Sequence, residues 1–413
     1  MTGTLPHLVV FTVLFPHPGQ PAAGLFVRER MFRTGQHLPL TVVAPVAWFP
    51  FQHLIRRWRP HFRPPAPRAE MQSGFEVLHP RFFSVPSVFK FLDGWSLALC
   101  TLPTMLRLRR KGRLDLIDAH FAYPDGYAAT LLGRWLKVPV TITLRGTEVP
   151  LSRTRIRRRM MIAGLKRAAR IFSVADAHKQ HVAAMGVAAE RVLVVGNGVD
   201  SRKFQSVPKH EARRELGIAP DAQVLISVGG LVERKGMHRV IECLPLLKQR
   251  HPRIQYLVVG GASPEGDYGA TLKKMVVDLG LDDTVRFLGP VPPERLTVPL
   301  SAADVFVLAT RNEGWANVFL EAMACGLPVV TTLVGGNAEV VCRPEYGRLV
   351  PFGVSGDLAA AIADALDTHW DRARIIEYAQ ANSWDSRVAV LVREFEQLAR
   401  AHAEAGAAAS VSR

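Results

Sequence analysis

The strongest constraint on the fold is a repeated alternation of short apolar runs with helical patterns along most of the chain. One apolar run, Val140–Leu144, follows a helical pattern over residues 126–136. Such an alternation is typical of βαβ units and a parallel sheet, so we expect an α/β fold. The runs predicted as strands are 8–14, 40–44, 75–78, 114–119, 140–144, 171–174, 192–195, 224–228, 256–259, 285–288, 305–308 and 327–332.

The length indicates two domains, because 413 residues exceed what one hydrophobic core ordinarily serves. The segment GNGVD after the strand predicted at 192–195 marks where the chain leaves its first sheet. We therefore expect an N-terminal domain at 1–199 and a C-terminal domain at 200–382. An amphipathic helix follows over 383–400, with Ser383 as N-cap, and the Ala- and Ser-rich residues 401–413 predict a flexible tail.

The net charge of +16 comes from the first half of the chain. Residues 1–200 carry 28 basic and 11 acidic groups, whereas residues 201–413 carry 24 and 25. An asymmetry of this size implies an anionic partner. The basic clusters are Arg56, Arg57 and Arg59, then 107–113, then 153–170, where eight basic residues occur without an acidic one.

The cluster at 153–170 interleaves apolar residues such as Met160 and Leu165 with its charges, a pattern that suits a helix on an anionic membrane surface. Phe89, Phe91, Leu92 and Trp95, ahead of the second cluster, could supply an apolar wedge. Two alternatives stay open. The segment can be the solvated face of a helix over an ordinary core, or it can bind nucleic acid, although no recognised nucleic-acid motif accompanies it.

The cysteines and the hydropathy favour a cytoplasmic protein. The four cysteines are widely spaced and form no CxxC pair, which is typical of a reducing compartment. No apolar stretch approaches the roughly 20 residues needed to span a bilayer. The apolar run near the N-terminus lacks a preceding basic region, so we interpret it as a first strand and not as a signal peptide.

Two carboxylates eight positions apart stand out in RNEGWANVFLEAMACGLPVVTT, residues 311–332. Glu313 lies in a glycine-containing turn, and Glu321 lies in a short helical pattern that Gly326 ends. A buried strand is predicted directly afterwards. The two carboxylates therefore lie at a loop-to-helix junction.

A second polar segment, SVGGLVERKG, combines a strand end, two glycines and the cations Arg234 and Lys235 before a helix. This arrangement suits a diphosphate, whose charge two cations and a helix N-terminus can meet, although cations at a helix start also face solvent. Doubly wound sheets bind ligands at the carboxyl ends of their strands. Gly229, Gly260, Thr310 and Glu313 are all predicted there. The dehydrogenase and P-loop glycine fingerprints are absent from the sequence.

The motif EGWANVFLE followed by AMACGLPVV resembles the E-x7-E signature of the retaining glycosyltransferases of family 4. The segments GGLVERKG, VVGGAS, VFVLAT, VGGNAEVV and GNGVD follow in the family's order, so the resemblance spans nearly the whole chain. HFAYPDGYAA and LRGTEV look most like enzymes that build bacterial exopolysaccharide or teichuronic-type glycans. The resemblance implies a GT-B fold, in which two Rossmann-like doubly wound domains face each other across a cleft and the last helix packs back on the first domain.

The resemblance also implies roles for individual residues. Glu321 would bind the ribose of a nucleoside diphosphate sugar, Glu313 the transferred sugar, and Arg234 and Lys235 the diphosphate. His120 would orient the donor sugar. No covalent nucleophile, metal or separate cofactor is implied. Further donor-binding positions are Gly24, Gly229, Gly230, Gly260, Asn317 and Val318, and Gly335, Gly336 and Asn337 would offer backbone amides to the substrate or form only a tight turn.

One segment departs from the family pattern. Many relatives carry His-Gly-Ser/Thr-Asp where this chain has Arg145, Gly146, Thr147 and Glu148. An arginine keeps its positive charge and cannot act as a base, so Arg145 with Gly146 would instead meet a phosphate or an acidic sugar. This departure leaves the donor sugar and the acceptor open, and it makes a non-catalytic relative thinkable.

The expected function is a cytoplasmic, metal-independent, retaining hexosyltransferase. It would move a sugar from a nucleoside diphosphate to a glycan or a lipid-linked acceptor in bacterial surface polysaccharide synthesis, peripherally at the inner face of an anionic membrane. Two alternatives are a soluble transferase with a small acceptor and a nucleotide-sugar-binding regulatory protein without turnover. Nucleic acid is not expected as a partner.

Overall fold

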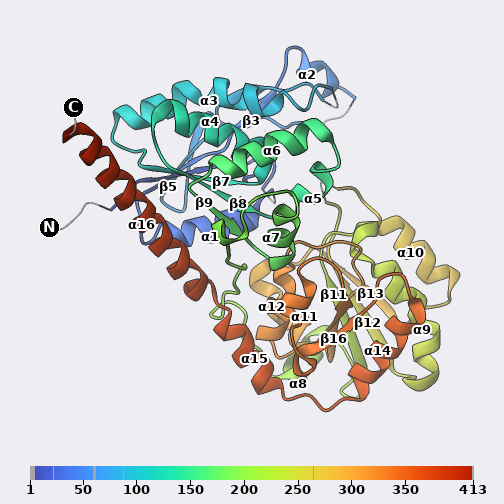
Figure 1. Cartoon of the computed structure of the whole chain (residues 1–413). Coiled ribbons are helices and arrows are strands. Elements are labelled where there is room, and N and C mark those ends of the chain that lie inside the picture. The colour runs from blue at the N-terminus through green and yellow to red at the C-terminus, as the bar shows by residue number, and fades with distance from the viewer. Residues whose placement is uncertain (1–4, 22, 59–61, 87, 264, 412–413) are drawn as a thin grey trace. The chain divides into compact units, whose positions relative to one another are not determined.

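The computed structural model describes residues 5–21, 23–58, 62–86, 88–263 and 265–411 (Figure 1). Arg59 of the first basic cluster and the last two residues of the expected tail lie outside these ranges. The chain divides into two compact units. Unit 1 comprises Met1–Asn197 and Arg387–Arg413, and unit 2 comprises Gly198–Ser386.

Unit 1 contains an eight-stranded sheet in the order β10-β9-β8-β7-β1-β2-β5-β4. Neighbouring strands are parallel except for the antiparallel pair β4–β5 at one edge. The strand order reverses between β1 and β7, as in a doubly wound sheet. The strands are β1 (Leu8–Phe11), β2 (Leu40–Val43), β4 (Ala69–Gln72), β5 (Phe75–Leu78), β7 (Leu116–His120), β8 (Val140–Leu144), β9 (Arg170–Ser173) and β10 (Val192–Val194).

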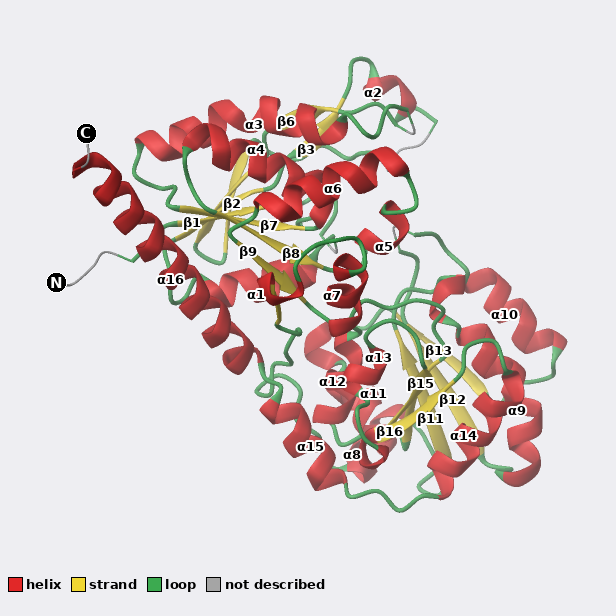
Figure 2. Ribbon diagram, in the orientation of Figure 1, coloured by secondary structure: helices red, strands yellow, loops and turns green. Residues whose placement is uncertain are grey.

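Helices cover both faces of this sheet (Figure 2). Successive residues of β7 point to opposite faces, so Ile117 packs in one core with Leu97 of α3, while Leu116 packs in the other with Met31 of α1 and Phe395 of α16. The helices of unit 1 are α1 (Leu25–Thr34), α2 (Gln52–Ile55), α3 (Asp93–Arg110), α4 (Tyr127–Leu136), α5 (Glu148–Leu151), α6 (Arg155–Arg167), α7 (Asp176–Ala183) and α16 (Trp384–Val411), with short turns η1 (Ala122–Gly126) and η2 (Ala189–Arg191).

Unit 2 contains a six-stranded, all-parallel sheet in the order β13-β12-β11-β14-β15-β16. Its order reverses between β11 and β14, which makes that pair the switch point of the sheet. The strands are β11 (Gln223–Val228), β12 (Ile254–Val259), β13 (Val285–Gly289), β14 (Val305–Leu308), β15 (Val329–Thr332) and β16 (Gly347–Val350).

Two separate apolar cores also cover the faces of the second sheet. One contains Met237 and Leu244 of α9, and the other contains Phe319 of α12. The helices are α8 (Lys209–Leu216), α9 (Met237–Arg250), α10 (Gly269–Asp278), α11 (Thr297–Ala302), α12 (Asn317–Ala324), α13 (Asn337–Val340), α14 (Ser355–Asp367) and α15 (Arg372–Ala381), with short turns η3 (Glu233–Lys235), η4 (Pro293–Arg295) and η5 (Pro344–Tyr346). The predicted α/β class with parallel sheets is confirmed.

Some boundaries differ from the sequence prediction. The first strand ends at Phe11 and not at Leu14, because the N–H of Val13 donates to the Asp125 carboxyl instead of to a neighbouring strand. Just before the basic residues Arg56 and Arg57 the chain forms α2, and a small parallel sheet of β3 (Val46–Trp48) with β6 (Arg81–Phe83) was not predicted. Strands β4 and β16 were also not predicted.

The two helices singled out in the sequence also differ in detail. α16 continues to Val411 where we expected a frayed tail, consistent with the high helix propensity of its alanines. The apolar residues Met161 and Leu165 of α6 are fully buried in the core of unit 1. The basic residues of α6 therefore form a solvated face over a core. Met161 and Leu165 are not available to a membrane, whereas Ile156 near the start of the helix is 49% exposed.

Candidate functional site

The charged residues predicted from SVGGLVERKG and from the E-x7-E motif meet at the switch point of unit 2. β11 and β14 are neighbouring parallel strands, so the loops that follow them start side by side. The loop after β11 leads into η3, which carries Arg234 and Lys235, and the loop after β14 carries Glu313. The tertiary structure thus joins two motifs that lie about eighty positions apart in the sequence.

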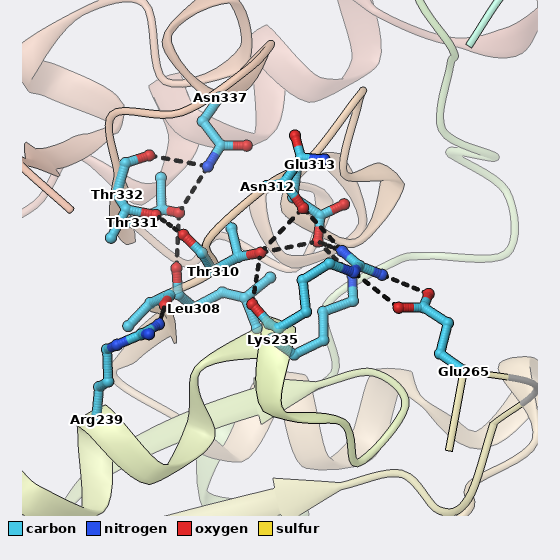
Figure 3. Close-up of polar contacts among 12 residues, drawn as sticks. Lys235, Arg239, Glu265, Leu308, Thr310, Asn312, Glu313, Thr331, Thr332 and Asn337 are labelled. Carbon is cyan, nitrogen blue, oxygen red and sulfur yellow. Dashed lines mark hydrogen bonds and ion pairs between the residues drawn. The ribbon is translucent and has the colours of Figure 1, made fainter. Parts of the chain in front are cut away.

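Glu313 is the centre of this cluster (Figure 3). Its Oε1 accepts a hydrogen bond of 2.6 Å from Lys235 Nζ and one of 3.1 Å from Arg234 Nη1. The hydroxyl of Thr310 donates to the same oxygen at 3.3 Å. The Glu313 side chain is only 9% exposed, so these charge-assisted contacts form where water screens them weakly.

Arg234 is held by a second carboxylate that the sequence prediction missed. Its Nε and Nη2 donate to the two oxygens of Glu265 at 2.8 and 2.6 Å, and its Nη1 also donates to the carbonyl of Asn312 at 2.8 Å. The hydrogen bond with Glu265 is the main reason that the pKa of Arg234 is raised and that the pKa of Glu265 is lowered. The only sign of this partner in the sequence is that an acidic residue lies in the loop after β12.

Glycines let four backbone segments approach one another in pairs at this edge of the sheet. A Cβ on Gly260 would lie 1.8 Å from the carbonyl oxygen of Gly229, and one on Gly335 would lie 1.7 Å from the carbonyl oxygen of Glu313. Gly335 has a φ of 51°, which disfavours other residues. The glycine-rich turn after β15 therefore packs directly on the backbone that carries Glu313.

The other predicted substrate positions in this turn have structural partners. The amide of Asn337 is buried and donates to Thr331 Oγ1 at 3.1 Å and to the Thr332 carbonyl at 2.9 Å, so Figure 3 shows it turned toward β15. The N–H of Gly336 donates to the carbonyl of Glu313 at 3.4 Å. In this structure the segment holds the loop of Glu313 in place.

The remaining predicted donor positions of unit 2 surround the cluster. Asn317, Val318 and Glu321 are half-buried on α12, which starts four residues after Glu313. Gly229 lies beside the Lys235 side chain, and a Cβ there would be 3.5 Å from Lys235 Cε. A Cβ on Gly230 would lie 2.9 Å from Ser263 Cβ.

A second polar group occupies the carboxyl edge of the sheet in unit 1. His120 ends β7, Arg145 follows β8, and Asn197 lies just after β10. Arg145 Nε donates to His120 Nδ1 at 3.1 Å, and its Nη1 donates to Asn197 Oδ1 at 3.4 Å. Asp118 lies two residues before His120 on the same face of the strand, with its Oδ2 3.2 Å from His120 Nε2.

Burial determines the electrostatics of this second group. His120 is fully buried, which lowers its pKa to about 4 and keeps the imidazole neutral at pH 7. It contacts Arg145 and Asp118, and its side chain is fully buried. The sequence alone does not indicate that Arg145 contacts His120.

Arg30 of α1 adds a second buried guanidinium that the sequence did not indicate. Its Nη2 donates to the carbonyl of Val195 at 2.9 Å, and the side chain is fully buried. Burial and the neighbouring charge of Arg30 both lower the pKa of Arg145. Among the described residues, Arg30 Nε and Nη1 and Arg145 Nη2 are buried without a hydrogen-bond partner. Asp118 is the carboxylate that acts on both guanidiniums.

Two glycines of unit 1 that were predicted as substrate-binding positions also have roles in the local structure. Gly24 precedes α1 with a φ of 66°, and a Cβ there would lie 2.2 Å from the carbonyl oxygen of Leu14. The N–H of Gly146 donates to Glu148 Oε1 at 2.9 Å, and the same oxygen lies 3.3 Å from His178 Nδ1. Glu148 thereby fixes the segment that follows Arg145.

Two family models match consecutive parts of the chain. The model described as "Glycosyltransferase Family 4" matches residues 52–203, and "Glycosyl transferases group 1" matches residues 208–382. In the solved structure of Anabaena Alr3699/HepE in complex with UDP, 22% of aligned residues are identical, the TM-score is 0.72, and the match covers 95% of this chain and all of that chain. This likeness concerns the fold, which is GT-B.

Curated relatives give the same family. A D-inositol 3-phosphate glycosyltransferase of Thermomonospora curvata is 30% identical over 78% of this chain and 81% of its own. A putative teichuronic acid biosynthesis glycosyltransferase, TuaC of Bacillus subtilis, is 29% identical over 86% and 87%. Against two other proteins described as D-inositol 3-phosphate glycosyltransferases, the chain spans about half of their length, 51% and 54%. The chain belongs to the glycosyltransferases of family 4 with the GT-B fold.

Proposed function

We propose that this protein is a retaining glycosyltransferase that uses a nucleoside diphosphate sugar as its donor. The observation that carries the proposal is the convergence of Arg234 and Lys235 on the Glu313 carboxylate at the switch point of the second sheet. Ligands of doubly wound sheets bind at that place. A site with two cations beside a carboxylate can hold a diphosphate and the hydroxyls of a sugar together.

Each charged residue of the site is assigned to one part of the donor. Lys235 and Arg234 bind the diphosphate, Glu313 accepts hydrogen bonds from the transferred sugar, and Glu321 accepts them from the ribose. The UDP complex of the HepE structure, which has the same fold, supports a nucleoside diphosphate as the ligand. The glycines at 229, 260 and 335 keep side chains out of the region where the loops meet.

The chemistry follows from the position of the cations. The bond between the anomeric carbon and the diphosphate oxygen breaks while the acceptor hydroxyl attacks from the same face, and the acceptor proton passes to the departing diphosphate. Arg234 and Lys235 stabilise the negative charge that develops on that leaving group. The proposal assigns this role to two side chains, so the transfer does not depend on a metal ion.

Arg234 must change partners when the donor binds. In this structure Glu265 occupies its Nε and Nη2, the two donors that face away from Glu313. Glu265 is 53% exposed, so water weakens this pair and a diphosphate can displace it at low cost.

We propose a glycan or a lipid-linked acceptor, as in bacterial surface polysaccharide synthesis. The similarity to a putative teichuronic acid biosynthesis glycosyltransferase over 86% of the chain supports this acceptor class. A small-molecule acceptor is the second candidate, because another relative is described as a D-inositol 3-phosphate glycosyltransferase. Turnover distinguishes both from a regulatory protein that only binds the nucleotide sugar.

Peripheral binding to the inner face of an anionic membrane completes the proposal. In the described part of the chain, no helix is both long and apolar enough to cross a bilayer. Instead, unit 1 exposes large apolar side chains at α2 and at the start of α3, among them Phe51, Trp58, Phe89 and Trp95. Basic residues on the solvent side of α6 add attraction to anionic lipids.

A panel of nucleotide sugars tests the donor proposal. We expect the wild-type protein to release nucleoside diphosphate from one of them when an extract of lipid-linked glycan acceptors is added. EDTA should leave this rate unchanged, and the anomeric configuration of the product should match that of the donor. Tight binding of a nucleotide sugar with no turnover by any acceptor would instead indicate the regulatory function.

Flotation with vesicles tests the membrane proposal separately. The wild-type protein should float with phosphatidylglycerol vesicles and should be released by salt. Phe51→Ser/Trp58→Ser should remain at the bottom of the gradient. The matched variant Leu246→Ser/Val277→Ser, which removes exposed apolar side chains from unit 2, should float like wild type. A wild-type protein that stays unbound at low salt would reject membrane association.

A further inference from the structure

A cavity in unit 1, distant in sequence from the motifs of the candidate site in unit 2, has the chemistry of a phosphate-binding pocket. It has a volume of about 450 Å³ and lies beside α2 and the small β3–β6 sheet. Figure 2 shows these elements together at the end of unit 1 that carries α2. Its lining combines aromatic side chains with the arginines Arg56, Arg63, Arg68 and Arg81.

Positive charge predominates in this cavity. Its lining contains four arginines and no Asp or Glu. Burial lowers the pKa of Arg63, although Asp93, which lines the adjoining hollow, acts on that pKa in the opposite direction. Among the described residues, none of the four guanidiniums forms an ion pair. The nearby carboxylate of Glu70 is already engaged, because its Oε1 lies 2.9 Å from Nε2 of His79, which also lines the cavity, and accepts from Gln72 Nε2 at 2.7 Å.

The four arginines divide into a wall and a rim. Arg56 and Arg63 form the wall and donate to backbone carbonyls, Arg56 to Phe62 and Arg63, and Arg63 to Ser84. Arg68 and Arg81 are exposed, and the described structure gives their guanidiniums no partner. The rim arginines are therefore available to a ligand without breaking any existing contact.

Aromatic groups give the cavity an apolar side. Trp48, Phe49 and Phe51 line it, and the guanidinium carbon of Arg63 lies 5.6 Å from the ring centroid of Phe49. Phe51 is 72% exposed. A ligand that pairs an anionic group with an apolar or ring-shaped portion would satisfy both kinds of lining.

A second hollow lies between this cavity and the carboxyl edge of the sheet. It has a volume of about 340 Å³, and both hollows are lined by Val46, Arg63 and His79. Its other lining residues include Val13, just after β1, and Pro124, after β7. The arginine-lined cavity thus adjoins a hollow that reaches the loops after β1 and β7, where the order of the sheet in unit 1 reverses.

We infer that this cavity binds the phosphate or diphosphate group of the acceptor. The inference rests on the proposed transferase function and extends it by giving the acceptor an anionic group. The same chemistry fits two sources, a water-soluble sugar phosphate and a phosphorylated isoprenoid lipid, and the apolar lining can hold either the ring or the first part of the lipid chain.

Binding measurements with two probes test the inference and separate the sources. Glucose 1-phosphate represents the soluble source and geranyl phosphate the lipid source, with glucose and geraniol as uncharged controls. We expect wild type to bind one phosphate probe and neither control in isothermal titration calorimetry at fixed ionic strength. Arg68→Gln/Arg81→Gln should weaken that binding about tenfold, because it removes two charge-assisted contacts from the rim.

A charge-matched variant controls for general electrostatics. Arg107→Gln/Arg110→Gln removes two exposed charges from the end of α3 in the same unit and should weaken binding less than twofold. Equal weakening by both double variants would overturn the inference, as would absence of binding of both phosphate probes to wild type.

A further variant separates this site from the donor site. Lys235→Ala should lose UDP binding but keep the phosphate probe, whereas Arg68→Gln/Arg81→Gln should keep UDP. Loss of the probe only in Lys235→Ala would show that phosphate binds in unit 2 and would reject the pocket. Failure of wild type to bind UDP would reject the proposed donor, a result independent of the probe measurements.

Discussion

The two units place cations at the carboxyl edges of their sheets but compensate them differently. In unit 2, Arg234 and Lys235 meet the carboxylates of Glu313 and Glu265 at 2.6 to 3.1 Å. In unit 1, the guanidinium of Arg145 meets a neutral histidine and an asparagine. The cations of unit 2 therefore sit in a neutralised, exchangeable network, whereas those of unit 1 carry buried positive charge in excess.

The difference indicates different tasks. A half-exposed ion pair costs little to open, so Arg234 can exchange Glu265 for an incoming diphosphate. A buried charge without a full set of partners is costly to stability. The network in unit 2 suits reversible binding, and the cluster in unit 1 depends on one carboxylate, Asp118.

The largest effect should follow from removing that carboxylate. Asp118→Asn leaves the buried guanidiniums of Arg30 and Arg145 without a compensating charge, so we expect the free energy of unfolding to fall by about 3–5 kcal/mol. Urea denaturation at pH 7 measures this loss. Glu190→Gln, at an exposed position of the same unit, should change it by less than about 0.5 kcal/mol. Equal stability of the two variants would mean that the cluster carries no excess charge.

Lys235→Ala should cause the largest loss of activity. It removes one of two cations that stabilise the leaving diphosphate, so kcat/KM for the donor should fall by about 10²–10³-fold. The control is Lys248→Ala, a half-buried lysine on α9 paired with the exposed Asp283, which should leave kcat/KM unchanged. If Lys235→Ala retains full activity, the cation pair does not bind the diphosphate.

Acid should destabilise unit 1 through His120. Its pKa is about 4 in the folded protein, below the ordinary value of 6.5, so its contribution to stability is complete above pH 6.5 and is lost as the pH falls toward 4. The loss should reach about 3 kcal/mol, and His120→Gln should lack this part of the pH dependence. Denaturation curves of both proteins between pH 7 and pH 4.5 give the difference directly.

Comparison of wild type with His120→Gln is necessary because Asp125 changes the stability with pH in the opposite direction. Burial raises its pKa to about 8, so its contribution to stability is complete below pH 3.8 and is lost as the pH rises toward 8. The wild-type curve contains both effects, whereas the difference between wild type and His120→Gln isolates the histidine. A difference that stays constant with pH would contradict the neutral state of His120.

Glu265→Gln should have the smallest effect and should sharpen the contrast between the networks. Loss of its charge frees Arg234 for the diphosphate, so UDP should bind about two- to fivefold more tightly, within the range expected for an exposed ion pair. Fluorescence titration with UDP at low and high salt measures this gain, which salt should reduce. Weaker binding of UDP by the variant would show that Glu265 supports the bound state instead of competing with it.

The sequence by itself determined the fold class and most of the elements. The alternation of apolar runs with helical patterns is a local property, and Val140–Leu144 and Val305–Leu308 form strands with the predicted bounds. Family resemblance assigned Arg234, Lys235 and Glu313 to one donor site, and these three side chains do meet in unit 2. Their individual roles toward a donor stay predictions.

Only the tertiary structure decided which charges compensate one another. Glu265 and Arg30 belong to no motif. Glu265 reaches Arg234 because parallel strands bring distant loops to one edge of a sheet. Arg30, in the middle of α1, reaches the Arg145 cluster because that helix packs on the sheet of unit 1. Burial decided the rest. Burial at the end of β7 keeps His120 neutral, and packing in unit 1 buries Met161 and Leu165 of α6. Both effects depend on how much water the neighbouring elements exclude.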